Sequence, residues 1–167
     1  LVAPTYGQNL RATLFTDADA LIAEGKEVRA DVLSPKSWNK AMERFISAER
    51  KLTAGDNLDD IRKELDKATG HFQTAIDGTE LAHVTLSSSL KAHDDAAKVD
   101  AAQNAPLLWK EAAAKFAEAG TKLEEGKIKD ARKKGAEAEA LFRDAELSAI
   151  KTSFFDETRK LLNRADQ

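Results

Sequence analysis

Glu80 and His83 have the Glu-x-x-His spacing that di-iron carboxylate proteins use on their metal-binding helices. Such a site needs two of these motifs and two further glutamates, all facing the interior of a helical bundle. His71 and His93 have no glutamate three residues earlier, and no His-Glu-x-x-His motif occurs in the chain. We therefore predict no metal-binding residue, and a metal-binding helical bundle centred on Glu80 and His83 is kept only as a remote alternative.

Ser88 and Lys91 have the Ser-x-x-Lys spacing of penicillin-recognising serine enzymes, and Lys151–Ser153 reads Lys-Thr-Ser, close to the Lys-Thr-Gly element of those enzymes. Those enzymes also need a mixed α/β fold, a Ser-Asp-Asn element and a longer chain. Phosphate-binding loops, dinucleotide-binding glycine motifs and nucleophile elbows are missing from the sequence. The sequence therefore predicts no catalytic and no cofactor-binding residue, and a protein that is not an enzyme.

The composition favours helices over a bulky globular core. Of the 167 residues 33% are charged and 6% are aromatic, and three prolines leave long uninterrupted stretches. The net charge of −3 provides no global field for nucleic acid or an anionic membrane, so we predict no nucleic-acid partner. The absence of cysteine excludes disulfides and thiolate chemistry. No apolar run reaches 18 residues, and no transmembrane segment is predicted.

The chain contains an internal duplication. Residues 34–55 align with 105–126, and after a one-residue slip residues 57–75 align with 127–145, with fourteen of 41 positions identical. In the first copy a Pro-x-x-Trp start is followed by apolar residues at alternating spacings of three and four: Trp38, Ala41, Phe45, Ala48 and Leu52. This spacing predicts a helix with one apolar stripe, capped by Ser34 and ended by Gly55, and the second copy repeats it up to Gly126.

The fold class predicted is all-α, with about five helices and no strands. We expect one domain over residues 1–167, built from an N-terminal helix over 14–33, a first hairpin repeat over 34–103 and a second over 104–167. The two duplicated long helical hairpins would form an elongated bundle or a short solenoid. The first dozen residues are expected to be irregular. Five residues are expected to pack on the last helix: Leu147, Ile150, Phe154, Leu161 and Leu162.

Two features of the repeats could mark binding surfaces. Trp38 and Trp109 could stack on a ligand, but their duplicate positions on the apolar stripe favour packing between the hairpins. Lys127–Lys134 carries five basic residues and one acidic residue, whereas Asn57–Glu64 in the first copy carries two basic and three acidic. This cluster is either a solvated helix start or a patch for an acidic partner. The sequence leaves the binding residues unknown.

The repeated pattern resembles the alanine-rich helical-repeat regions of bacterial envelope proteins, often lipoproteins, that precede an OmpA-like peptidoglycan-binding domain. Four stretches carry the resemblance: Leu33–Trp38, Ala105–Trp109, Leu123–Arg132 and Leu141–Lys151. A weaker likeness is to tetratricopeptide repeats, whose period is about half of this one. The OmpA-like domain and a lipid-bearing cysteine are absent from the sequence, so peptidoglycan would be bound only through a domain that is absent here.

The resemblance implies a non-catalytic structural spacer or protein-interaction module of the Gram-negative cell envelope. It also implies a periplasmic or outer-membrane-associated location, and the start at "LVAPTYG" suggests a processed or trimmed chain. A cytosolic tetratricopeptide-like adaptor for a peptide or protein is the alternative. A protein partner is expected but not identified, and self-association through the alanine stripe stays open.

Overall fold

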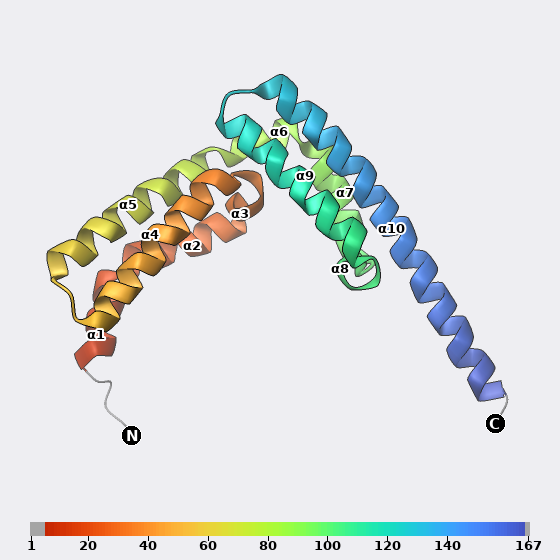
Figure 1. Cartoon of the computed structure of the whole chain (residues 1–167), viewed down its shortest axis with the longest axis horizontal. Helices are drawn as coiled ribbons and strands as arrows, with labels where there is room; N and C mark the ends of the chain where they lie inside the picture. Colours follow the sequence, from red (N-terminus) through yellow and green to blue (C-terminus); the bar gives the residue numbers. More distant parts are fainter. Residues whose placement is uncertain (1–5, 166–167) are drawn as a thin grey trace. The chain divides into compact units, whose positions relative to one another are not determined.

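The computed structural model describes the backbone of residues 6–165 and the side chains of residues 10–164. Within these residues the chain is helical and contains no strand, which confirms the all-α class (Figure 1). Contacts divide the chain into two compact units, unit 1 over Leu1–Ala82 and unit 2 over His83–Gln167. The sequence had placed all helices in one domain, with the division between its repeats at 103/104.

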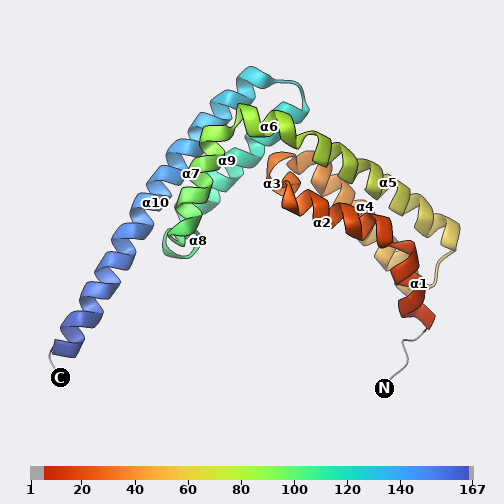
Figure 2. The same cartoon turned by 180° about the vertical axis from the view of Figure 1, so that it is seen from behind.

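Unit 1 is built on a helical hairpin with a third helix against it. Its helices are α1 (Tyr6–Leu14), α2 (Thr16–Glu27), α3 (Ala30–Leu33), α4 (Pro35–Ala54) and α5 (Leu58–Asp77), followed by α6 (Thr79–Thr85), within which the division between the units falls. Helices α4 and α5 pack along their length, and α2 lies against α5 (Figures 1 and 2). The expectation of an irregular start was wrong from Tyr6 onward, and residues 1–5 lie outside the described part.

Unit 2 has the same construction. It contains α7 (Ser87–Lys98), α8 (Ala101–Asn104), α9 (Pro106–Glu124) and α10 (Ile128–Ala165). Helices α9 and α10 form the hairpin, and α7 packs against α10 (Figure 2). The count of about five helices was too low, because both the expected 14–33 helix and the expected second helix of the first repeat are interrupted. Arg29 and Asp100 take left-handed backbone angles, with φ of 61° and 54°, and this geometry ends each helix there.

The duplication extends further towards the N-terminus than the sequence indicated. Shifted by 71 positions, α2 and α3 coincide with α7 and α8 at both ends, and the left-handed Arg29 coincides with Asp100. Val28/Val99 and Ala30/Ala101 are the only identical pairs between residues 16–33 and 87–104. Backbone conformation therefore preserves the repeat where side-chain identity has been lost.

The apolar stripe predicted for the hairpins forms the core of each unit. In unit 1 Phe72 is fully buried, the ring of Trp38 meets it edge-on at 5.0 Å, and Phe15 meets Phe45 edge-on at 5.4 Å. The alanines between these rings are fully buried and let the helices approach closely: Ala41, Ala48, Ala68 and Ala75. In unit 2 Phe116 and Phe142 take the corresponding positions.

Glycine ends the first helix of each hairpin as predicted. Gly55 and Gly126 have φ of 76° and 73°, in the left-handed region that favours glycine. The N–H of Asp56 donates to the carbonyl of Lys51, and the N–H of Lys127 donates to that of Lys122, at 3.0 and 2.8 Å. Both hairpins therefore turn through the same backbone motif.

Ser34 does not cap α4, although the sequence predicted that it would. Its side chain makes no capping hydrogen bond, and its Oγ is buried with no partner among the described residues. The close approach of Gly78 explains the burial, because a Cβ placed on that glycine would lie 2.6 Å from the Ser34 Oγ. The equivalent residue in unit 2 is Ala105, which has no polar side-chain atom to bury.

Ser34→Ala is expected to stabilise unit 1 by about 1 kcal/mol, because a buried hydroxyl without a partner costs about that much or more. Ser89→Ala is the matched control, since Ser89 is equally buried but donates to the Gly135 carbonyl at 2.8 Å. That variant should lose about 1 kcal/mol. Urea unfolding followed by circular dichroism measures both changes, and the same sign for both would contradict the interpretation.

The last part of α10 differs from the expectation. The five residues expected to pack are exposed to between 47% and 66%: Leu147, Ile150, Phe154, Leu161 and Leu162. Ala149 is the last fully buried residue among the described side chains of α10. None of the described helices has an apolar stretch long enough to cross a bilayer.

Candidate functional site

The residues with metal-ligand or nucleophile spacing do not form a site. Glu80 and His83 are both exposed on α6, and among the described residues no three His, Cys, Asp or Glu side chains gather in a group that could hold a metal ion. Ser88 is exposed on α7, while the Lys91 Nζ donates to Asp95 at 2.6 Å. These spacings arise from the exposed faces of helices.

His93 and the tryptophans belong to the packing. The His93 ring lies 4.9 Å from that of Trp109 and 5.1 Å from that of Phe142, at the position that Ile22 has in unit 1. Trp38 is buried, and Trp109 is half-buried with its ring edge-on to Phe142 at 5.3 Å. The structure therefore favours packing over ligand stacking, and the described ring contacts of each tryptophan lie within its own unit instead of between the hairpins.

A buried carboxylate joins the two helices of the unit 1 hairpin. The side chain of Glu64 on α5 is only 10% exposed and accepts a hydrogen bond from the Arg44 Nη1 of α4 at 3.2 Å. Lys51 of α4 and Lys67 of α5 lie 3.6 and 3.7 Å from its other oxygen. Burial alone would raise the pKa of Glu64, but the Arg44 hydrogen bond and the three cations lower it below its ordinary value of 4.5.

The same place in unit 2 holds a network of inverted charge. Lys134 replaces Glu64, and its Nζ lies 3.0 Å from Glu118 of α9 and 3.1 Å from Glu137 of α10, which replaces Lys67. Hydrogen bonds to Glu118 and Glu137 raise the pKa of Lys134 well above its ordinary value. The charges at positions 134 and 137 are reversed, while the cations on the first helix of the hairpin are kept. Because an ion-pair network occupies the same place in both units, we assign it to holding each hairpin together.

This network changes the interpretation of the basic cluster at Lys127–Lys134. Lys134 is engaged between the hairpin helices, and Lys127 lies 2.9 Å from Glu125. Lys129, Arg132 and Lys133 are exposed, and none of the described ion pairs involves them. Their spacing of three and four places them on one face of α10, which we call the basic face.

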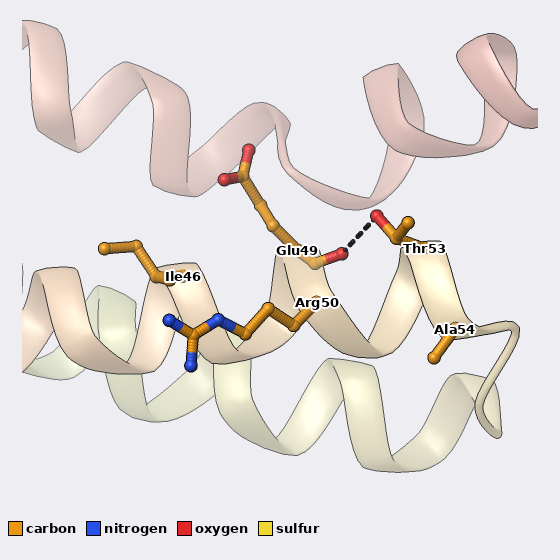
Figure 3. Close-up of a pocket in the computed structure, with 5 residues that line it drawn as sticks. All are labelled: Ile46, Glu49, Arg50, Thr53 and Ala54. Carbon is orange, nitrogen blue, oxygen red and sulfur yellow. Dashed lines mark hydrogen bonds between the residues drawn. The ribbon is translucent and has the colours of Figure 1, made fainter.

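The depressions on the described surface are shallow. One of about 380 Å³ lies along α4 and is lined by residues of successive turns: Ile46, Glu49, Arg50, Thr53 and Ala54 (Figure 3). Its only drawn hydrogen bond joins the Thr53 hydroxyl to the Glu49 carbonyl, within the helix. The Glu49 carboxylate is occupied by Arg11 at 2.9 Å. The depression therefore offers a solvated helix face and few polar groups for a small ligand.

Acid should destabilise both units through their paired carboxylates. Hydrogen bonds from Lys91 and Arg143 hold the pKa of Asp95 well below its ordinary value of 3.8, and the bond from Lys134 lowers the pKa of Glu118. Groups with a lowered folded-state pKa stabilise the fold above their unfolded-state pKa, and this stability is lost as the pH falls through the folded-state pKa. We expect the urea midpoint to stay level near neutral pH and to fall progressively below about pH 5.

The control for this pH dependence is Asp95→Asn. Because the asparagine cannot titrate, the variant should be less stable than the parent at pH 7 and should lose less of its stability on acidification. An identical slope in parent and variant below pH 5 would show that Asp95 does not contribute.

Sequence reasoning missed the paired network, although the alignment of the copies contained its signal. Position 64 changes from Glu to Lys in the second copy, and position 67 changes from Lys to Glu at its counterpart 137. Two opposite charge changes one turn apart are expected when the residues share an ion-pair network. Glu118 carried no such signal, because its counterpart is the uncharged Ser47.

Fold and surface together define an all-α protein made of two copies of one helical unit. Comparison with protein-family models, with curated proteins and with solved structures finds no match. Arguments about its function therefore rest on the arrangement of its own residues.

Proposed function

We propose that the protein is a non-catalytic helical-repeat module that acts as a structural spacer and protein-interaction surface. One observation carries the proposal: the two units keep the same backbone and the same phenylalanine and alanine positions in the hairpin core, while their exposed charges differ. A repeat array whose units share a core and vary on the surface is the usual construction of binding and spacing proteins. The 38-residue α10 alone spans about 57 Å, which suits a spacer.

The basic face is the surface that we assign to an acidic protein partner. In unit 1 its counterparts are Asp59, Arg62 and Lys63, and Arg62 lies 3.5 Å from Asp59. Lys129 replaces that aspartate in unit 2, which leaves the cations together near the N-terminal end of α10. The helix dipole disfavours cations there, so these residues lower the stability of α10 and no described ion pair offsets the loss.

The location proposed is the periplasm or outer membrane of a Gram-negative bacterium, and its support is the resemblance of the repeats to envelope proteins. The tetratricopeptide-like alternative has less support, because each unit packs three long helices in a 71-residue repeat instead of a helix pair. The metal-binding bundle has less still, because Glu80 and His83 are exposed on one short helix.

Site-specific photo-crosslinking in producing cells tests this function. A crosslinking residue at Lys129 should capture an envelope protein, whereas the same residue at Asp59, its counterpart in unit 1, should capture little. Replacing Arg132 and Lys133 by glutamine should reduce capture at position 129, since neutral side chains no longer attract an acidic surface. Recovery of the protein in the cytosolic fraction would refute the envelope location, and equal capture from both positions would refute the basic face.

A further inference from the structure

The end of α10 carries an apolar face that nothing in unit 2 covers. Phe154, Phe155, Leu161 and Leu162 are each about two-thirds exposed, whereas Ala149 is fully buried. Figure 1 shows this part of α10, in dark blue, continuing past the N-terminal end of α9. Four large apolar side chains on three helical turns are more than scattered surface residues would provide.

The sequence of residues 151–165 follows the apolar pattern of residues 11–25, at the start of unit 1. Phe155 matches Phe15, Leu161 matches Leu21 and Leu162 matches Ile22. The small positions also agree, since Thr158 matches Ala18 and Ala165 matches Gly25. The corresponding small residues in α7 are Ser89 and Ala96.

In unit 1 these positions receive the α4–α5 hairpin. Phe15 is fully buried and meets Phe45 of α4 edge-on, and Ala18 is 1% exposed. Gly25 lies directly against the Trp38 ring, because a Cβ placed there would clash with Cζ3 of the ring. The pattern at the end of α10 is therefore the pattern of a helix that packs beneath a Pro-x-x-Trp hairpin.

We propose that residues 150–165 are the first helix of a third unit, and that their apolar face is the docking surface for that unit's hairpin, of the α4–α5 type. The hairpin's phenylalanine packs over Phe155. A second copy of α10 fits less well, because one face of a helix about 24 Å long falls short of the roughly 800 Å² per partner that stable interfaces bury. The inference uses the repeat geometry and does not depend on the basic face or on the envelope location.

The test extends the full chain by a copy of its own residues 28–77. Gln167 aligns with Glu27, so this segment continues the register of the repeat when it is joined directly after Gln167. Hydrogen–deuterium exchange of residues 150–165 is compared between the extended and the original chain. We expect at least tenfold slower exchange in the extended chain. Unchanged exchange there would overturn the proposal.

Two substitutions in the extended chain make the test specific. Phe155→Glu should abolish the protection, whereas Lys160→Glu should retain it, because the counterpart of Lys160 is the exposed Ala20. In the original chain Phe155→Glu should leave the unfolding midpoint unchanged, since Phe155 is exposed there. A large loss of stability in the original chain, or a dimer that Phe155→Glu disrupts, would show a different occupant and would also overturn the proposal.

Discussion

Phe72→Ala is expected to lower the free energy of unfolding of unit 1 by about 3–5 kcal/mol. Phe72 is fully buried, and its ring contacts those of Trp38 and Phe45 at 5.0 and 6.5 Å. The alanines around it cannot fill the space, because a methyl side chain has no other rotamer that would extend into the cavity. The loss therefore combines the transfer of the ring to water with the cavity that remains.

The measurement is urea unfolding in a Trp109→Phe background, so that fluorescence reports on Trp38 and hence on unit 1. Phe154→Ala is the matched control, because it removes the same ring from an exposed site and should change stability by less than about 0.5 kcal/mol. If Phe72→Ala cost as little as Phe154→Ala, the ring cluster would not be the core of unit 1.

Much of the hairpin architecture could be predicted from the sequence because its signals are local. The alternation of Trp38, Ala41 and Phe45 fixes one buried face, and Gly55 fixes the turn through its left-handed conformation. The interruption at Arg29 could not be predicted, because arginine rarely takes that conformation. Aspartate takes it more often, but no glycine or proline next to Asp100 marks a break there. The helices before and after each of these residues therefore read as one helix in the sequence.

Less of the candidate site could be predicted from the sequence, because a charged residue occurs at the same helical spacing whether or not it forms an ion pair. Lys134 and Lys133 are neighbours in one basic run, yet the first lies between two glutamates and the second is exposed. The position of α9 beside α10 distinguishes them in the structure, and the charge exchange between the two copies is the only trace of the difference in the sequence. The exposure of Phe154 could not be predicted either. Its spacing is that of a core position, and whether another helix covers that position depends on residues far from it in the sequence.

The two units also show how a core can change while the backbone is kept. Ser89 and Gly135 in unit 2 stand where unit 1 has Ala18 and Leu65, so a larger residue on one helix is matched by a smaller one on the other. Close packing explains this coupling, because the interior has no spare volume for an unmatched change. Gly25 and Trp38 are the most extreme example of this size matching, because the smallest residue lies against the largest.

Gly25→Ala is expected to destabilise unit 1 by about 1–2 kcal/mol, although alanine is the better helix former. The new Cβ would clash with Cζ3 of Trp38 and lie 3.1 Å from its Cη2, and this rigid ring can only move as a whole. Overpacking of this kind costs about 1–3 kcal/mol, and the gain of up to about 1 kcal/mol from helix propensity offsets only part of it. Trp38 should move outward, towards the half-buried state of Trp109, whose neighbour at the equivalent position is Ala96.

Gly70→Ala provides the matched control for this change. Gly70 is exposed inside α5 with nothing within 4 Å of an added Cβ, so the same substitution should stabilise unit 1 by about 0.5–1 kcal/mol. Urea unfolding gives both values, and in the Trp109→Phe background the emission of Trp38 should shift to the red only in Gly25→Ala. A stabilising effect at both glycines would show that the Trp38 ring yields freely, and that the contact with α2 does not set the position of that ring.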